Sequence, residues 1–221
     1  MKFNWLFTNK KSNYPDFWTD YINRFKDLKN DPIKNTRFIA FDTETTGFDR
    51  IEDRILSIGA VSIIDNAIEV KKSFEIYLEQ DVFKPDSVKI HGLIKNSLLE
   101  KVSELDAIKA FLDYIKNDVL IAHHANFDKN MINEMLLRHG LGKLKNEFID
   151  TGVLYKKSKH IIYQENLKHY SLDDLCEELN VPKADRHTAS GDALITAIVF
   201  LKILSRLDKR KHLNWNYLLN I

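Results

Sequence analysis

The stretch from Arg37 to Gly47 constrains the fold most, because an apolar run there ends in two closely spaced acids. The run has the apolar and aromatic composition of a buried strand. Asp42 and Glu44 follow at alternate positions, so on a strand both acids point to the same face. Two such charges at the end of a core strand repel each other unless a cation lies between them. Mg²⁺ and Mn²⁺ prefer oxygen ligands of this kind. Taken alone, however, Asp-x-Glu is more often a solvated strand end.

The length allows one sizeable α/β domain, or one domain plus an appendage, and the composition is ordinary for a globular protein. The chain has 221 residues, of which 44% are hydrophobic and 29% charged, with a formal net charge of +1. This near-neutral balance predicts no global attraction to polyanions, so nucleic-acid binding would need local basic patches. The lone Cys176 lies in a helical apolar pattern and is interpreted as a buried structural thiol. No apolar run is long enough to span a membrane, and we expect a cytoplasmic protein without a membrane partner.

Periodicity predicts strands first and alternating strands and helices later. An N-terminal helix with an aromatic stripe is expected in residues 1–35, the main domain in 36–207 and a short extension in 208–221. Within the main domain, after the first strand, the predicted elements are strands 54–64 and 67–78, helix 98–115, strand 119–123, a helix capped by Asn126, strand 147–150, helix 172–179 capped by Ser171, and a last helix from Thr188 or Ser190 through Leu204. Short turns make the first three strands antiparallel, and a crossover helix makes the next parallel. We therefore predict a mixed sheet flanked by helices.

Two further polar clusters follow later in the chain. His123-His124-Ala125-Asn126-Phe127-Asp128 places an acid in the first turn of a helix that directly follows a strand, where open α/β sheets form active sites. His187-Thr188-Ala189-Ser190-Gly191-Asp192 places a histidine before the last helix and an acid in its first turns. Each cluster alone is an ordinary helix start.

Together with the first acids, these clusters resemble the DEDD superfamily of 3′–5′ exonucleases in its histidine subtype, a group that includes proofreading epsilon subunits, ribonuclease T and oligoribonuclease. The three motifs occur in the family's order over about residues 37–204. His124 stands where the family usually has Asn. The resemblance implies a ribonuclease H-like fold.

The four carboxylates Asp42, Glu44, Asp128 and Asp192 could hold two divalent ions, Mg²⁺ or Mn²⁺, for phosphoryl transfer. His187 is the candidate general base, because imidazole titrates near neutral pH. By resemblance, the terminal nucleotide lies over the turn at Thr45 and Thr46. The resemblance also makes His91 and Asp86 candidate substrate contacts. Separately, a basic patch could contact phosphates, although a solvated face is the more common explanation for such a run; its residues are Lys156, Lys157, Lys159, His160 and Lys168.

The sequence leaves the substrate and partners open. We expect hydrolysis from a single-stranded 3′ end, with DNA favoured over RNA. An RNA-trimming or oligonucleotide-degrading nuclease is the alternative, since no motif distinguishes a 2′-hydroxyl. A non-catalytic nucleic-acid-binding or scaffold module is the alternative from another class. A polymerase or other protein partner is possible, with the N-terminal helix or the aromatic ending as docking element.

Overall fold

A seven-stranded mixed sheet forms the centre of the computed structural model. The structure describes residues 14–26, 32–82, 84, 92, 99–159, 169–209 and 213–219. The strand order is β5-β4-β2-β1-β6-β7, with β3 paired to β2. The strands are β1 (Phe38–Thr45), β2 (Ile55–Ile64), β3 (Ala67–Ile68), β4 (Phe74–Leu78), β5 (Lys101–Val102), β6 (Val119–Ala122) and β7 (Phe148–Asp150).

Strand pairing changes from antiparallel to parallel at β1, the strand that carries Asp42 and Glu44. β1 pairs antiparallel with β2, and β2 pairs antiparallel with β4. On its other side β1 pairs parallel with β6, which pairs parallel with β7. The predicted mixed sheet, antiparallel first and then parallel, is therefore confirmed. β4 also pairs parallel with β5, a contact the sequence did not predict.

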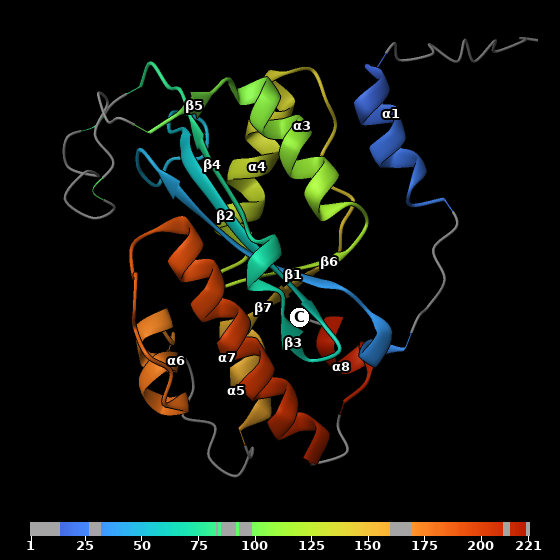
Figure 1. The fold of residues 1–221 in the computed structure, drawn as a ribbon, viewed down its shortest axis with the longest axis vertical. Helices are drawn as coiled ribbons and strands as arrows, with labels where there is room; N and C mark the ends of the chain where they lie inside the picture. The colour runs from blue at the N-terminus through green and yellow to red at the C-terminus, as the bar shows by residue number, and fades with distance from the viewer. Residues whose placement is uncertain are drawn as a thin grey trace, which may run out of the picture.

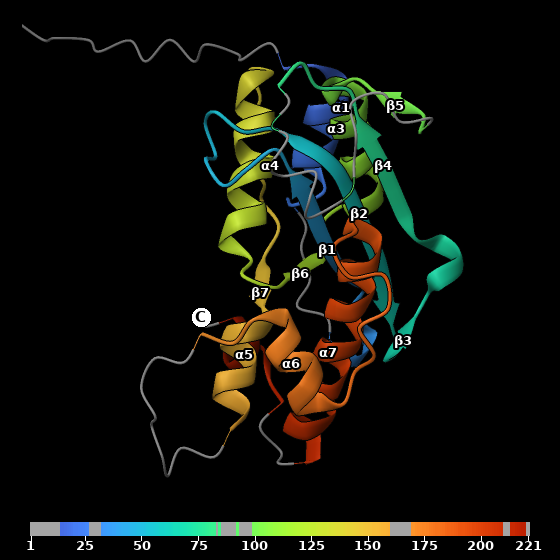
Figure 2. The same cartoon turned by 90° about the vertical axis from the view of Figure 1, so that its left-hand side faces the viewer.

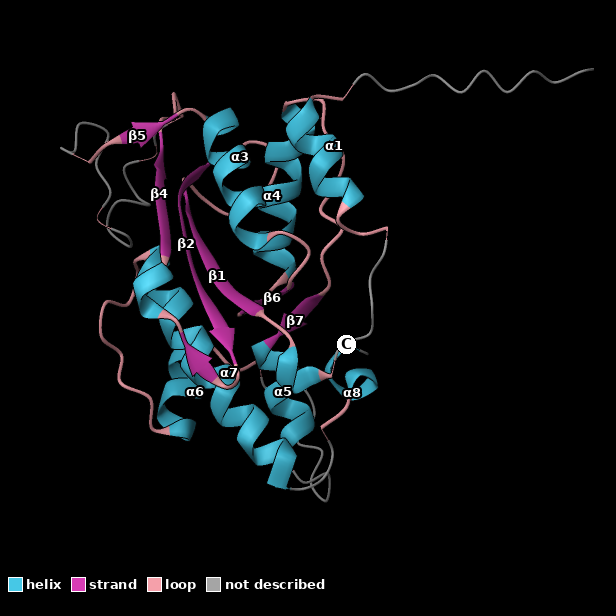
Figure 3. Ribbon diagram, turned by 45° about the vertical axis from the view of Figure 1, so that its right-hand side comes forward, coloured by secondary structure: helices cyan, strands magenta, loops and turns pink. Residues whose placement is uncertain are grey.

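Helices cover both faces of the sheet in two groups (Figures 1 and 2). The first group is α1 (Asp16–Asn23), α3 (Glu104–Ile115) and α4 (Asn126–Arg138), and the second is α5 (Thr151–Ser158), α6 (Leu172–Leu179), α7 (Ala189–Lys209) and α8 (Trp215–Leu219). Two 3₁₀ turns cover Ile33–Asn35 and Val70–Lys72. Figure 3 shows the strands running between these two groups of helices.

The core divides along the same lines, because neighbouring residues of β1 point to opposite faces. Ile39 and Phe41 pack in one apolar cluster with residues of α1, α3 and α4. Phe38 and Ala40 pack in a second cluster with residues of α5, α6 and α7. The two faces of β1 therefore pack against different groups of helices up to the position where Asp42 follows.

Several helix starts have the capping chemistry expected from the sequence. Ser171 caps α6 in a capping box with Asp174, as predicted. The Gly191 N–H donates to Thr188 Oγ1 at 3.1 Å, so Thr188 is the residue that caps α7. α7 itself extends five residues beyond the predicted end at Leu204.

Other predicted boundaries are wrong. The strand expected over 67–78 is split into β3 and β4, because Val70–Lys72 forms a 3₁₀ turn between them. The helix expected from residue 98 begins at Glu104, where Ser103 accepts from the Asp106 N–H, and Lys101–Val102 is a strand instead. Asn126 does not cap α4, since it is already the first helical residue. Helices α5 and α8 were not predicted at all.

The N-terminal helix α1 is part of the described core. Trp18 and Tyr21 are each 2% exposed. The Tyr21 hydroxyl donates to Asn146 Oδ1 at 2.6 Å and accepts from the Lys145 N–H at 2.8 Å. The aromatic stripe predicted for this helix is therefore packed against the main sheet's helices. Within the ranges described, no helix combines the length and apolarity that a membrane crossing would require.

Candidate active site

The end of β1 presents its acids toward α7. Asp42 and Glu44 continue the face on which Phe38 and Ala40 pack against α7. Thr43 continues the opposite face, on which Phe41 packs against α4 and its neighbours. The alternation of one strand thus directs two carboxylates to one helix and a hydroxyl to another.

Helix α7 reaches the acids because β2 carries a glycine beside them. Gly59 is the β2 partner of Asp42 in the strand register. A Cβ on Gly59 would lie 2.2 Å from the Ala189 carbonyl carbon and 2.2 Å from the Ser190 nitrogen. The first turn of α7 therefore lies directly on the β2 backbone, and Asp192 in this turn meets Asp42 and Glu44. Ligand oxygens of these three acids lie within 4.8 Å of one another.

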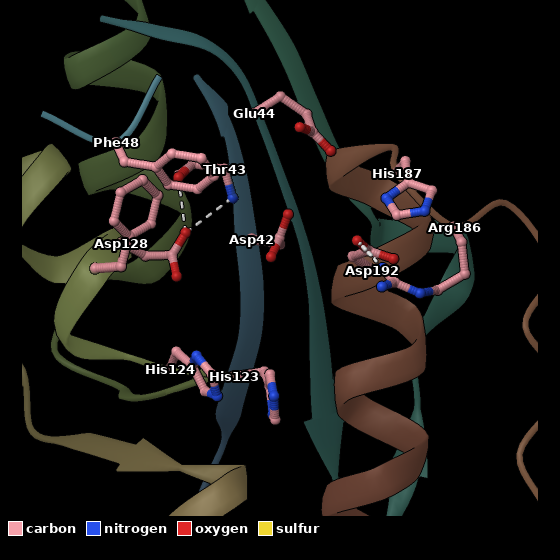
Figure 4. Close-up of a pocket in the computed structure, with 11 residues that line it drawn as sticks. Asp42, Thr43, Glu44, Phe48, His123, His124, Asp128, Arg186, His187 and Asp192 are labelled. Atoms are coloured by element: carbon pink, nitrogen blue, oxygen red, sulfur yellow. Dashed lines mark hydrogen bonds and ion pairs between the residues drawn. The ribbon is translucent and has the colours of Figure 1, made fainter. Parts of the chain in front are cut away.

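Asp128 approaches from the other helix group. It lies in the first turn of α4 and is 3% exposed. Its Oδ1 accepts two hydrogen bonds from Thr43, at 3.1 Å from the backbone N–H and 2.7 Å from the hydroxyl. The Asp150 carboxylate fixes the start of α4 by accepting from the Ala125 N–H at 2.8 Å, and it also caps α5. Asp42 consequently lies between Asp128 on α4 and Asp192 on α7 (Figure 4).

These four acids line one open cavity of about 360 Å³. Its walls come from β1 and the turn after it, from the start of α4 and from the loop before α7 (Figure 4). The other lining residues are Thr43, Phe48, His123, His124, Phe127, Arg186 and His187. The three motifs that are separated in the sequence are therefore brought together in one cavity.

Burial and mutual repulsion raise the pKa values of the acids. Burial, followed by the charges of Asp128, Asp192 and Glu44, raises the pKa of Asp42 well above its usual range. Burial and the neighbouring carboxylates raise the pKa of Glu44 to about 7. Burial likewise raises the pKa of Asp128 to about 7, although the Thr43 hydrogen bonds oppose this rise. Carboxylates held so close resist ionisation unless a cation joins them.

The donor set suits such a cation. Asp192 Oδ1 is buried and has no hydrogen-bond partner among the described residues, although a buried carboxylate oxygen normally has one. An all-carboxylate cluster is the ligand set that hard divalent ions such as Mg²⁺ and Mn²⁺ prefer. Arg186 is the charged partner that Asp192 does have, through Nη1 and Oδ2. Its Nε also donates to Asp173 Oδ1 at 2.9 Å.

The predicted base lies at the edge of the cavity. His187 is exposed and lines the cavity in the loop before α7, with a positive φ of 65°. This loop closes tightly on the helix, because a Cβ on Gly191 would lie 2.0 Å from the Asp185 carbonyl oxygen. His187 and Asp192 therefore approach the cavity from the same turn (Figure 4).

A pair of stacked histidines lines the opposite part of the cavity from His187. The rings of His123 and His124 stack at 4.3 Å. His123 Nδ1 lies 2.9 Å from Thr151 Oγ1, and its buried Nε2 has no hydrogen-bond partner within the described part of the chain. Burial, helped by His124, lowers the pKa of His123 to about 4, so this ring is neutral at physiological pH. His124, the departure from the family pattern, has a φ of 58° and its Nε2 lies 3.3 Å from the Tyr170 carbonyl oxygen.

The turn after β1 is held by its own polar residues. Thr46 is 1% exposed, and its hydroxyl donates to Asp53 Oδ1 at 2.7 Å. The Thr45 hydroxyl donates to the Gly47 carbonyl at 2.7 Å. Neither threonine is among the cavity-lining residues, so only their backbone stays a predicted substrate contact. The turn instead presents Phe48, which is 83% exposed and lies 5.9 Å from the Phe127 ring.

Other predicted contacts lie outside the described residues or have local partners. Asp86, His91, His160 and Lys168 are not among the described residues. Lys159 Nζ lies 2.8 Å from the Tyr170 hydroxyl and 3.3 Å from Glu178 Oε1. Lys157 lies over the Tyr217 ring. Lys156, in contrast, lines a second cavity of about 350 Å³ that shares His124 and Phe127 with the first.

The sequence analysis proposed no role for Arg186, Phe48 or His123, although His123 opens the second polar cluster. Arg186 precedes the predicted base directly, but nothing local distinguishes it from a surface arginine. Phe48 follows Gly47 in the turn, and an aromatic residue in an exposed turn is a signal that could have found it. His123 could have been identified from its place at the end of a buried strand.

Comparisons with known proteins agree with this geometry. A profile of the RNase T family, described as "Exonuclease", matches residues 39–200. The chain is 34% identical over 173 residues to the PolC-type DNA polymerase III of Caldanaerobacter subterraneus subsp. tengcongensis, covering 78% of this chain but 12% of that protein. It is 32% identical over 177 residues to the epsilon subunit of DNA polymerase III from Salmonella typhimurium, covering 75% of this chain and 70% of that one.

The fold is also similar to a solved nuclease. Exonuclease I of E. coli in complex with a dT13 oligonucleotide superposes with a TM-score of 0.64 at 16% identity, covering 80% of this chain and 43% of that one. At this identity the likeness concerns the fold alone. The region that matches the PolC-type protein is likewise a small part of that protein's length.

Proposed function

Because the chain belongs to the RNase T exonuclease family, we propose that it is a metal-dependent 3′–5′ exonuclease that hydrolyses terminal phosphodiesters of single-stranded DNA. The observation that carries the proposal is the cluster of Asp42, Glu44 and Asp192, whose ligand oxygens lie within 4.8 Å of one another, with Asp128 in the same cavity. A scaffold module would have no physical reason to accumulate mutually repelling buried acids.

Asp42, Glu44, Asp128 and Asp192 are the residues that would hold two divalent ions, Mg²⁺ or Mn²⁺. Such ions, when bound, supply the positive charge that lowers the pKa of water and stabilises a leaving oxygen. Thr43 keeps Asp128 in place for this role through its two hydrogen bonds. Gly59 lets Asp192 come close enough to Asp42 for both carboxylates to bind the same ion.

His187 is the proposed general base. Its exposed ring lines the cavity, where it can accept a proton from a water near the acids. A neutral imidazole carries a ring nitrogen that accepts a proton, which is the property that this role requires.

Phe48 and Phe127 support a nucleic-acid substrate. Their rings are 5.9 Å apart at the cavity, and Phe48 is mostly exposed. Exposed aromatic faces beside a phosphodiester site bind unpaired bases by stacking, and stacking accepts any base. This supports single strands as substrate. DNA is favoured because the relatives that share 34% and 32% identity with this chain are named as DNA polymerase III proteins.

The proposal is tested with single-stranded DNA and RNA of one sequence, labelled at the 5′ or the 3′ end, with Mg²⁺, Mn²⁺ or EDTA. We expect a 5′-labelled ladder that shortens stepwise, requires metal and collapses in His187→Ala and Asp42→Asn. Faster RNA trimming would replace DNA with RNA as substrate. Absence of metal-dependent cleavage of both polymers would overturn the proposed enzyme.

A polymerase is the protein partner to test, since the epsilon relative is named as a subunit of DNA polymerase III. Gel filtration of the chain with the replicative polymerase of the same organism gives the answer directly. Co-elution would support a proofreading role, and separate elution would support a free-standing nuclease.

A further inference from the structure

Arg186 places a permanent positive charge inside the acidic cavity. Its Nη1 is paired with Asp192 Oδ2, and the two side chains are 17% and 10% exposed. Asp192 is also one of the three acids whose oxygens converge at the end of β1. The same carboxylate is therefore a partner of the guanidinium and a ligand for the proposed metal site.

We propose that Arg186 is an internal counter-ion that holds Asp192 in the metal-free protein and is displaced from it by the divalent ion. This inference rests on the proposed metal site. It concerns which group compensates the negative charge of the carboxylates in the metal-free protein. Three carboxylates within 4.8 Å require a compensating cation in a partly buried cavity. Among the described cavity-lining residues, Arg186 is the one whose side chain is always charged.

The guanidinium has a second partner, which makes the exchange possible. Arg186 Nε donates to Asp173 Oδ1 at 2.9 Å, and Asp173 is 45% exposed on α6. When Asp192 binds a metal ion, Arg186 keeps its pairing with Asp173 and is not left as an isolated buried charge. Asp173 thus serves as the anchor from which Arg186 can release Asp192.

The exchange predicts opposite effects of one substitution on two measurements. Arg186→Gln removes the counter-ion, so the metal-free protein should melt about 4 °C lower or more. The same change removes a positive charge beside the site, so Mn²⁺ should bind about tenfold more tightly or better. An orienting residue would behave differently, since its loss weakens metal binding, typically about 10–100-fold.

The test measures Mn²⁺ binding by calorimetry and melting in EDTA for the full chain and three variants. Arg186→Lys keeps the charge without the planar fork, and Mn²⁺ affinity should stay near that of the unchanged protein. Arg138→Gln is the matched control, because Arg138 pairs with Glu104 at 2.6 Å with similar burial, away from the cavity. This control should melt lower without any change in Mn²⁺ affinity.

The outcomes separate the two proposals. Tighter Mn²⁺ binding in Arg186→Gln alone supports the counter-ion, even if no nucleic acid is hydrolysed. Unchanged or weaker binding in Arg186→Gln, with normal binding in the unchanged protein, overturns the counter-ion and leaves the nuclease proposal standing. If neither the unchanged protein nor any variant binds Mn²⁺, the metal site and the counter-ion are both refuted.

Discussion

Gly59 of β2 and Ala189 of α7 are in backbone contact: a Cβ on Gly59 would lie 2.2 Å from the Ala189 carbonyl carbon. Gly59→Ala must therefore push the first turn of α7, and Asp192 with it, away from Asp42. We expect a loss of about 1–3 kcal/mol in unfolding free energy. Nuclease activity should fall by about 100-fold or more, because small misplacements of catalytic groups are this costly.

Gly142→Ala is the control for that substitution. Among the described residues, a Cβ there would meet only the Trp18 ring, at 3.1 Å and away from the cavity. Denaturant unfolding and single-turnover hydrolysis of both variants provide the comparison. If Gly59→Ala lost stability but kept full activity, the contact would not position Asp192.

Thr43→Val should shift the pH dependence of the reaction. The Thr43 hydroxyl donates to Asp128 Oδ1 at 2.7 Å and opposes the rise in the pKa of Asp128, which burial brings to about 7. Without this hydroxyl the carboxyl should ionise at higher pH, so the rising limb of the rate profile should move up by about one pH unit. Thr36→Val, which removes a hydroxyl donated to the Pro32 carbonyl, should leave the profile unchanged.

Metal should stabilise the protein most at neutral pH. Glu44 and Asp128 have pKa values of about 7 in the fold, above their ordinary values of 4.5 and 3.8. For an acid whose pKa is raised, the stability is complete below the unfolded value and is lost as the pH rises through the folded value. The metal-free protein should therefore lose stability from these groups between about pH 4 and pH 7.

Bound Mg²⁺ reverses this loss by pairing the ionised acids. The difference in melting temperature with and without Mg²⁺ should thus be small at pH 4.5 and grow through pH 7. Calorimetric melting across this range, with EDTA as reference, measures it. A difference that does not depend on pH would show that these carboxylates are not the ligands.

Phe48→Ala should weaken substrate binding without affecting the fold. The side chain is 83% exposed and lies beside Phe127, so its removal costs stacking with a base and little packing. We expect KM to rise roughly 5- to 150-fold, which corresponds to about 1–3 kcal/mol per stacked base, with kcat nearly unchanged. Ile51→Ala changes another exposed apolar residue, 61% exposed and outside the cavity lining. Equal effects of both changes would argue against stacking.

The motifs with a local physical cause were predictable from the sequence. The two-residue period of a strand places Asp42 and Glu44 on one face, and the capping chemistry of Ser171 and Thr188 fixes two helix starts. Their convergence with Asp128 followed from the resemblance and from the topology of a mixed sheet, and the structure brings all three motifs to one cavity.

The features that could not be predicted depend on contacts between different elements of the fold. Arg186 gains its place from Asp192 and Asp173, on two different helices. The start of α4 is fixed by Asp150, which lies 25 positions after Ala125, so a local search for a cap chose Asn126 instead. The strand predicted over 67–78 failed because apolar periodicity does not register a single turn at Val70–Lys72.

The order of the acids along the chain has a consequence during synthesis. Asp42 and Glu44 leave the ribosome long before Asp192, and α7 packs on both β1 and β2. At about 5–20 residues per second, the 64 positions from Asp128 to Asp192 take roughly 3–13 seconds to translate. For most of that interval the nascent protein holds three of the four carboxylates and neither Arg186 nor His187. The proposed site is therefore incomplete in the growing chain until the last long helix has docked.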